Sequence, residues 1–69
     1  MFHKGERWRH QNCIDVDIIV EKVVYRGPNY WKLKVFYWNR HYKDIILPTT
    51  DLVKIKCEDL SKWKLMESV

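Results

Sequence analysis

The chain is poor in the residues that turn, cross-link or loosen a backbone. Its 69 residues include only two glycines, two prolines and two cysteines. No glycine-rich turn is present to shape an oxyanion hole beside a nucleophile, which counts against covalent catalysis. The two cysteines, Cys13 and Cys57, fit an intracellular protein as free thiols, because structural disulfides belong to oxidising compartments.

Long hydrophobic runs are also missing. No uninterrupted apolar run exceeds four residues, whereas a membrane-spanning helix needs about 20. The first seven residues lack the apolar segment of a secretory signal peptide. We therefore expect a cytoplasmic, intracellular protein with no membrane partner.

What the chain does contain is typical of a small folded domain with a basic surface. Hydrophobic residues make up 46% of it and charged residues 32%, and there are four Trp, four Tyr and two Phe. A domain of this length buries only about 60% of the surface of its unfolded chain. We expect a single domain over residues 1–69 with a thin, aromatic core. The formal net charge of +4 permits nucleic acid or an acidic partner and excludes a strongly acidic DNA mimic.

Apolar residues recur at every second position through most of the chain, which is the pattern of β-strands. The expected strands are residues 6–10, 13–26, 30–38, 41–47 and 52–57, with a last short strand around 63–65. The apolar face passes from Ile14, Val16, Ile18 and Val20 to Val23 and Tyr25, and this slip near Glu21 and Lys22 predicts a β-bulge in the second strand. Residues 58–61 predict one 3₁₀ turn, and no dozen residues show a helical stripe.

Turn residues separate these strands. Residues 27–29 (Gly-Pro-Asn) and 48–51 predict turns, and Asn39-Arg40 predicts a tight two-residue hairpin. On the second strand, Asp15, Asp17 and Glu21 lie opposite the apolar face, and we expect them to be solvated.

Two segments carry a resemblance to a known group of folds: Gly5-Glu6-Arg7-Trp8 at the start, and residues 55–60 before the last strand. With the hairpins between them, they resemble the SH3-like small barrels, which include Tudor and KOW-type domains. The resemblance implies an all-β, SH3-like barrel of about five short antiparallel strands with one 3₁₀ turn near the C-terminus. The aromatic cage of methyl-ligand-binding Tudor domains has no matching positions here. Size and aromatic content are also similar to small accessory proteins of bacteriophages, which implies a setting in an infected host cell.

Metal and catalytic sites are not expected. His10 and Cys13 have a ligand-like spacing that His41 and Cys57 would complete, but structural zinc sites use two close pairs. A cysteine and a histidine of the same four residues could form a nucleophile and base, but the chain lacks a glycine-rich turn for an oxyanion hole, and so thin a domain rarely has a pocket that excludes water. We therefore predict a protein that is not an enzyme, with no cofactor and no metal.

The strongest functional pattern is an alternation of cations and aromatic rings on the strand over residues 30–38. One face of that strand carries Lys32, Lys34, Phe36 and Trp38, and the face is extended past the hairpin by Arg40, His41 and Lys43. Lysines neutralise phosphates and exposed rings stack on unpaired bases. These seven residues are the predicted binding site of a nucleic-acid-binding module.

Two alternatives stay open at this point. If both faces of this strand are covered, Phe36 and Trp38 belong to the core and the lysines only form a solubilising rim. The rings near the hairpin would also suit a protein partner, since Trp, Tyr and Arg are enriched in interface hot spots. The second hypothesis is therefore a protein-binding adaptor or inhibitor of the phage-accessory or anti-defence type, anchored by the Trp38 hairpin. A homo-oligomer would fit it, because self-association relieves a thin core.

Overall fold

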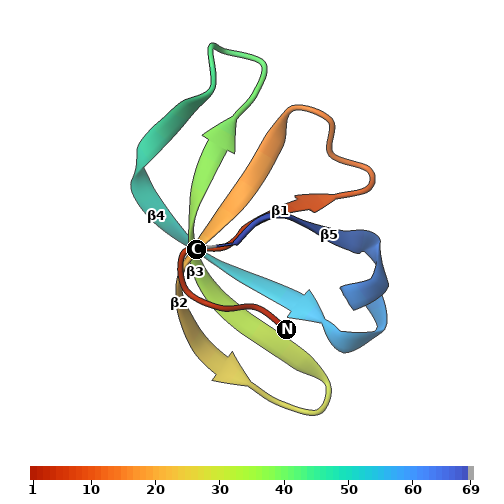
Figure 1. Cartoon of the computed structure of the whole chain (residues 1–69). Helices are drawn as coiled ribbons and strands as arrows, with labels where there is room; N and C mark the ends of the chain where they lie inside the picture. The colour runs from red at the N-terminus through yellow and green to blue at the C-terminus, as the bar shows by residue number, and fades with distance from the viewer. Residues whose placement is uncertain (69) are drawn as a thin grey trace.

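The computed structural model describes residues 1–68. Their five strands form one twisted antiparallel sheet (Figure 1). Its strands run in the spatial order β4-β3-β2-β1-β5, so that the first strand is paired on both sides. The elements are β1 (Arg7–His10), β2 (Val16–Arg26), β3 (Tyr30–Asn39), β4 (Ile45–Lys56), the 3₁₀ helix η1 (Cys57–Lys62) and β5 (Trp63–Glu67). The predicted all-β fold of about five antiparallel strands with one 3₁₀ turn near the C-terminus is confirmed. Within residues 1–68, no helix is long and apolar enough to cross a membrane.

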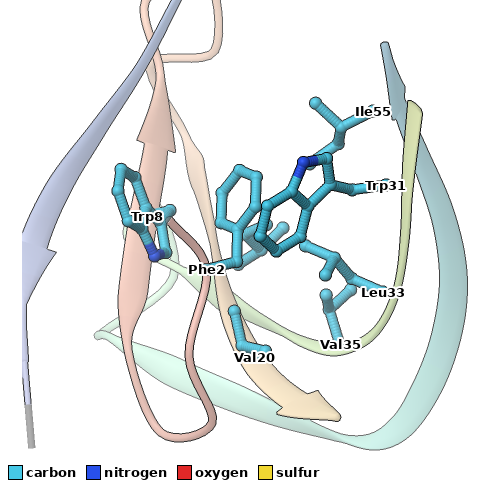
Figure 2. Packing of buried hydrophobic residues seen from close by; sticks show 8 residues of the cluster. Phe2, Trp8, Val20, Trp31, Leu33, Val35 and Ile55 are labelled. Atoms are coloured by element: carbon cyan, nitrogen blue, oxygen red, sulfur yellow. The ribbon is translucent and has the colours of Figure 1, made fainter. Parts of the chain in front are cut away.

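The core lies on the inner face of this sheet. The alternation is clearest in β3, where Trp31, Leu33 and Val35 are buried and the residues between them lie on the outer face, as the two-residue period requires. Figure 2 shows the buried side chains pointing toward one another from several strands. They are Phe2, Trp8, Ile18, Val20, Trp31, Leu33, Val35 and Ile55.

Phe2 is the core residue that the alternating pattern did not reveal, because it lies outside every strand. Its ring is 2% exposed and packs edge-on against Trp8 and Trp31, with centroids 4.8 and 5.5 Å away. The segment that brings it inward turns at Gly5, whose φ of 89° favours glycine. Gly5 donates its N–H to the Val20 carbonyl at 2.7 Å. The N-terminal segment is therefore part of the fold, covering one end of the core.

Strand β2 contains two β-bulges. The first falls at Glu21, where the register shifts between Val20 and Lys22, and confirms the bulge predicted from the sequence. The second falls between Val23 and Tyr25 and was not predicted. It turns Tyr25 to the outer face, so the interpretation that Val23 and Tyr25 share one apolar face is wrong. Bulges of this kind increase the local twist and help a small sheet to curl.

Two strand boundaries differ from the predicted ones. Residues 13–15 precede β2 instead of opening it, and Ile14 is 78% exposed. In place of the strands predicted over 41–47 and 52–57 there is one continuous strand, β4, which leaves residues 41–44 in the loop before it and Cys57 in η1. Pro48 does not turn the chain: it lies where the register with β3 shifts between Phe36 and Trp38, and both an edge strand and such an irregularity tolerate a proline.

The connection between β3 and β4 is also longer than the predicted two-residue hairpin. It runs over residues 40–44, and Lys43 and Asp44 both have a positive φ. Asn39 accepts hydrogen bonds on Oδ1 from the backbone N–H groups of His41 and Tyr42, at 2.9 and 3.1 Å. An Asn side chain that bonds its own backbone two residues on forms such a turn without the tight hairpin geometry.

Candidate nucleic-acid interface

Strand β3 presents the predicted cationic and aromatic residues outward. Trp31, Leu33 and Val35 are buried in the core, so Lys32, Lys34, Phe36 and Trp38 lie on the outer face of the sheet. Lys32 is exposed, whereas the other three side chains are half-buried by their neighbours. The four residues share one face, as the alternation requires.

The lysines of β3 are joined on this face by lysines of both neighbouring strands. Lys34 lies directly opposite Lys22 of β2, and Lys32 lies directly opposite Lys54 of β4. We call the resulting group the outer lysine face: Lys22, Lys32, Lys34, Lys54 and Lys56. None of the five forms an ion pair with a carboxylate in the described part of the chain. The sheet therefore carries a patch of uncompensated positive charge.

An aromatic pair borders one end of the outer lysine face. The rings of Tyr25 and Tyr30 lie 4.9 Å apart between centroids, and the Lys54 ammonium is 4.2 Å from the centre of the Tyr30 ring. Beside them is a cavity of about 390 Å³, which is large enough for one base-sized ring. It is lined by Pro28, Asn29, Tyr30, Lys54, Lys56, Cys57 and Glu58.

The other end of this face is built around a buried carboxylate. Asp17 is 0% exposed and accepts two hydrogen bonds from Arg9, at 2.8 and 3.1 Å. Arg40 Nε lies 3.1 Å and Arg7 Nε 3.5 Å from the same carboxylate. The paired hydrogen bonds raise the pKa of Arg9 above its ordinary value. The expectation that Asp17 is solvated is wrong, because β1 places the two arginines that flank Trp8 directly against it.

The remaining predicted residues gather near this carboxylate or in the loop beyond it. Trp38 donates its indole N–H to Asp44 at 3.1 Å, and the Arg7 guanidinium lies 4.2 Å from the centre of the Trp38 ring. Arg40 is drawn to Asp17 and donates to the Cys13 carbonyl at 2.9 Å. His41 and Lys43 are exposed in the loop over residues 40–44 and do not continue the strand face.

The sequence pattern alone did not identify several residues of this surface. Lys54 and Lys56 flank Ile55 just as Lys32 and Lys34 flank Leu33, and this repeated pattern on two neighbouring strands was a usable signal. Lys22 was hidden by the bulge at Glu21, since its face cannot be assigned until the extra residue is located.

The chain has no match among the known proteins with which it was compared: no family model, no curated protein and no solved structure is similar to it. Within residues 1–68, no three His, Cys, Asp or Glu side chains are grouped so that they could hold a metal ion. Cys13 and Cys57 are free thiols.

Proposed function

We propose that this protein is a non-enzymatic module that binds single-stranded nucleic acid across the outer face of β2, β3 and β4. The observation that carries the proposal is the pairing of like charges across the sheet, Lys22 with Lys34 and Lys32 with Lys54. Directly opposite like charges destabilise a sheet by up to about 1 kcal/mol per pair. A polyanion removes this repulsion, so the patch is better suited to a bound phosphate backbone than to water alone.

Aromatic rings at both ends of the outer lysine face support an unpaired strand as the ligand. Tyr25 and Tyr30 lie at one end, and Phe36 and Trp38 lie toward the other. Tyr30 and Trp38 are eight residues apart on β3, about 26 Å at the usual strand rise. Stacking on such rings needs bases that are free of a partner strand. The surface thus combines backbone neutralisation with base stacking along one direction.

The test is a fluorescence-anisotropy titration with labelled single-stranded and double-stranded oligonucleotides at two salt concentrations. We expect saturable binding, tighter for the single strand, that weakens steeply as salt rises because bound counterions are released. Absence of binding at low salt would remove this function. Equal affinity for both forms would assign the surface to phosphate contacts alone and exclude the stacking role.

We also propose kinship with the SH3-like barrels. It is supported by the strand order β4-β3-β2-β1-β5 and by the 3₁₀ helix η1, which connects β4 to β5.

A protein-binding role is the second candidate, and one observation favours it. Strand β4 is an edge strand that exposes large apolar side chains, with 43–56% of each accessible: Ile45, Ile46, Leu47 and Leu52. A partner strand could pair with that edge and cover them. Sedimentation of the protein with and without oligonucleotide tests self-association through this edge. A dimer that forms through β4 should appear without oligonucleotide and should not change when oligonucleotide is added.

A further inference from the structure

The arginines around Asp17 form a second cationic feature that the outer lysine face does not include. Three guanidinium groups, from Arg7, Arg9 and Arg40, all lie within 3.5 Å of one buried carboxylate. Three positive charges against one negative charge leave a surplus of two. Glu67 lies 3.9 Å from Arg7, but its side chain is 65% exposed, so water screens its contribution.

The arginine donors are held in place but not used up. In the described chain, the Arg7 guanidinium makes no hydrogen bond, and its Nε and that of Arg40 are buried without a hydrogen-bond partner. The side chains of Arg7, Arg9 and Arg40 nevertheless remain 20%, 31% and 21% exposed, so an incoming anion can reach them. Asp17 thus fixes three guanidinium groups around one point at the surface.

The charge of the cluster selects among anions. A carboxylate or an internal phosphodiester carries one negative charge and would leave one arginine charge unbalanced. A phosphate monoester carries about −1.5 to −2 near neutral pH and offers three acceptor oxygens. Guanidinium groups match phosphate oxygens in paired hydrogen bonds, which an ammonium group does not do. The cluster therefore fits a terminal phosphate better than an internal one.

We propose that Arg7, Arg9 and Arg40, positioned by Asp17, bind the terminal phosphate of a nucleic-acid strand that lies on the outer lysine face. That the phosphate belongs to a nucleic acid rests on the proposed function, whereas the binding of a phosphate by the three arginines does not. Trp38 supports the placement, because its ring lies under the Arg7 guanidinium and only four residues along β3 from Lys34. A terminal base that contacts the exposed part of this half-buried ring would bring its phosphate to the arginines.

The experiment compares oligonucleotides of one sequence that carry a 5′-phosphate, a 3′-phosphate or hydroxyl groups at both ends. We expect one phosphorylated end to bind at least tenfold tighter than the unphosphorylated strand. Arg7→Gln should abolish that difference, so that the phosphorylated and unphosphorylated strands bind this variant with equal affinity. Lys62→Gln is the matched control, since it removes one positive charge on η1 and should keep the preference. Equal affinity for all three strands, or a preference that survives Arg7→Gln, would overturn the proposal.

Asp17→Asn distinguishes a positioned site from a merely charged one. The substitution raises the charge of the cluster by one, so simple attraction would increase the preference for a terminal phosphate. Loss of the preference in a variant whose circular dichroism is native would support positioning by Asp17, and an increase would contradict it. If Asp17→Asn does not fold, Arg7→Gln carries the test, because Arg7 makes no hydrogen bond to Asp17.

Inorganic phosphate tests the site if no oligonucleotide binds. Saturable shifts of the side-chain Nε–H signals of Arg7, Arg9 and Arg40 in NMR spectra would support the phosphate site even though the proposed function had failed. If these signals do not shift, the cluster does not bind phosphate and serves only to hold β1 against β2. A phosphoserine peptide that binds as tightly as the phosphorylated oligonucleotide would overturn the nucleic-acid assignment.

Discussion

Lys22 and Lys34 face each other directly across β2 and β3 on the outer side of the sheet. Neither is ion-paired with a carboxylate in the described residues. Opposite charges at these two positions would make the free protein more stable than two lysines do. The two lysines therefore lower the stability of the free protein and raise its affinity for an anion.

Lys34→Glu should separate these two quantities. The new carboxylate would lie opposite Lys22, and we expect the free energy of unfolding to rise by about 0.2–1 kcal/mol in urea titrations. Affinity for single-stranded nucleic acid should fall, and the slope of log affinity against log salt should become shallower by about 0.7 or more.

The matched control for this change is Lys62→Glu, which alters the net charge equally but lies on η1 beside Asp59. It should weaken nucleic-acid binding much less than Lys34→Glu. Equal losses of affinity in both variants would mean that overall charge, and not the outer lysine face, drives association.

Asp17→Ala should be strongly destabilising. It leaves three guanidinium groups without their shared carboxylate, and removing one partner of a buried ion pair typically costs about 3–5 kcal/mol. We expect about 3 kcal/mol by urea denaturation, since the arginines keep some contact with water. Asp15→Ala is the comparison, because Asp15 is 57% exposed two residues away and should change stability by less than about 0.5 kcal/mol.

Phe2→Ala should destabilise the fold by about 3–5 kcal/mol, as for other buried phenylalanines. The ring is 2% exposed among Trp8, Trp31 and Trp63, and its removal leaves a cavity that the curled sheet cannot close. Thermal and urea unfolding followed by tryptophan fluorescence would measure the loss. Ile14→Ala, at a site 78% exposed, should be nearly neutral. A loss below 1 kcal/mol for Phe2→Ala would show that the N-terminal segment is not packed in the core.

Glu6 should make the stability depend on pH in the acid range. Burial alone would raise the pKa of Glu6, but hydrogen bonds from the His3 N–H and the Trp8 indole, with the nearby His3 charge, lower it below its ordinary value of 4.5. A lowered folded-state pKa contributes stability above the unfolded pKa, and this is lost as pH falls through the folded value. The difference in unfolding free energy between the wild type and Glu6→Gln should therefore shrink below pH 4.5.

A second variant checks the origin of that effect. Trp8→Phe removes the indole donor, so it should also reduce the pH dependence, although it destabilises the core for separate reasons. A constant difference between Glu6→Gln and the wild type from pH 7 to pH 3 would contradict the assignment.

The strand pattern could be predicted from the sequence because it depends on local alternation. Trp31, Leu33 and Val35 carry a clear two-residue period, so β3 could be predicted, whereas its buried face could not, because Phe36 and Trp38 make the other face partly apolar. The second bulge, next to Tyr25, could not be predicted, because an extra residue changes every later assignment without any local signal. The strand through Pro48 could not be predicted, because a proline is tolerated in a strand only at an edge, at the first residue or at an irregularity of the pairing, and these depend on the neighbouring strand.

The candidate site was only partly predictable for a related reason. Lys32, Lys34, Phe36 and Trp38 share one strand, and a single strand's face is visible in sequence. The cluster around Asp17 needs side chains from β1, β2 and the loop after β3 to meet, which depends on strand order. An acidic residue next to a hydrophobic face looks solvated until the neighbouring strand is known.

The pairing of β1 with β5 also bears on how the chain reaches this structure. Arg9 lies opposite Lys64, and Phe2 packs against Trp63, so the first and last elements depend on each other. Contacts between such distant positions close large loops, and folding rates fall as their share of all contacts grows. The hairpins of β2, β3 and β4 close only short loops, so they can form before β1 and β5 pair. We therefore expect the pairing of β1 with β5 to be a late step of folding, which completes the sheet on the side opposite β4.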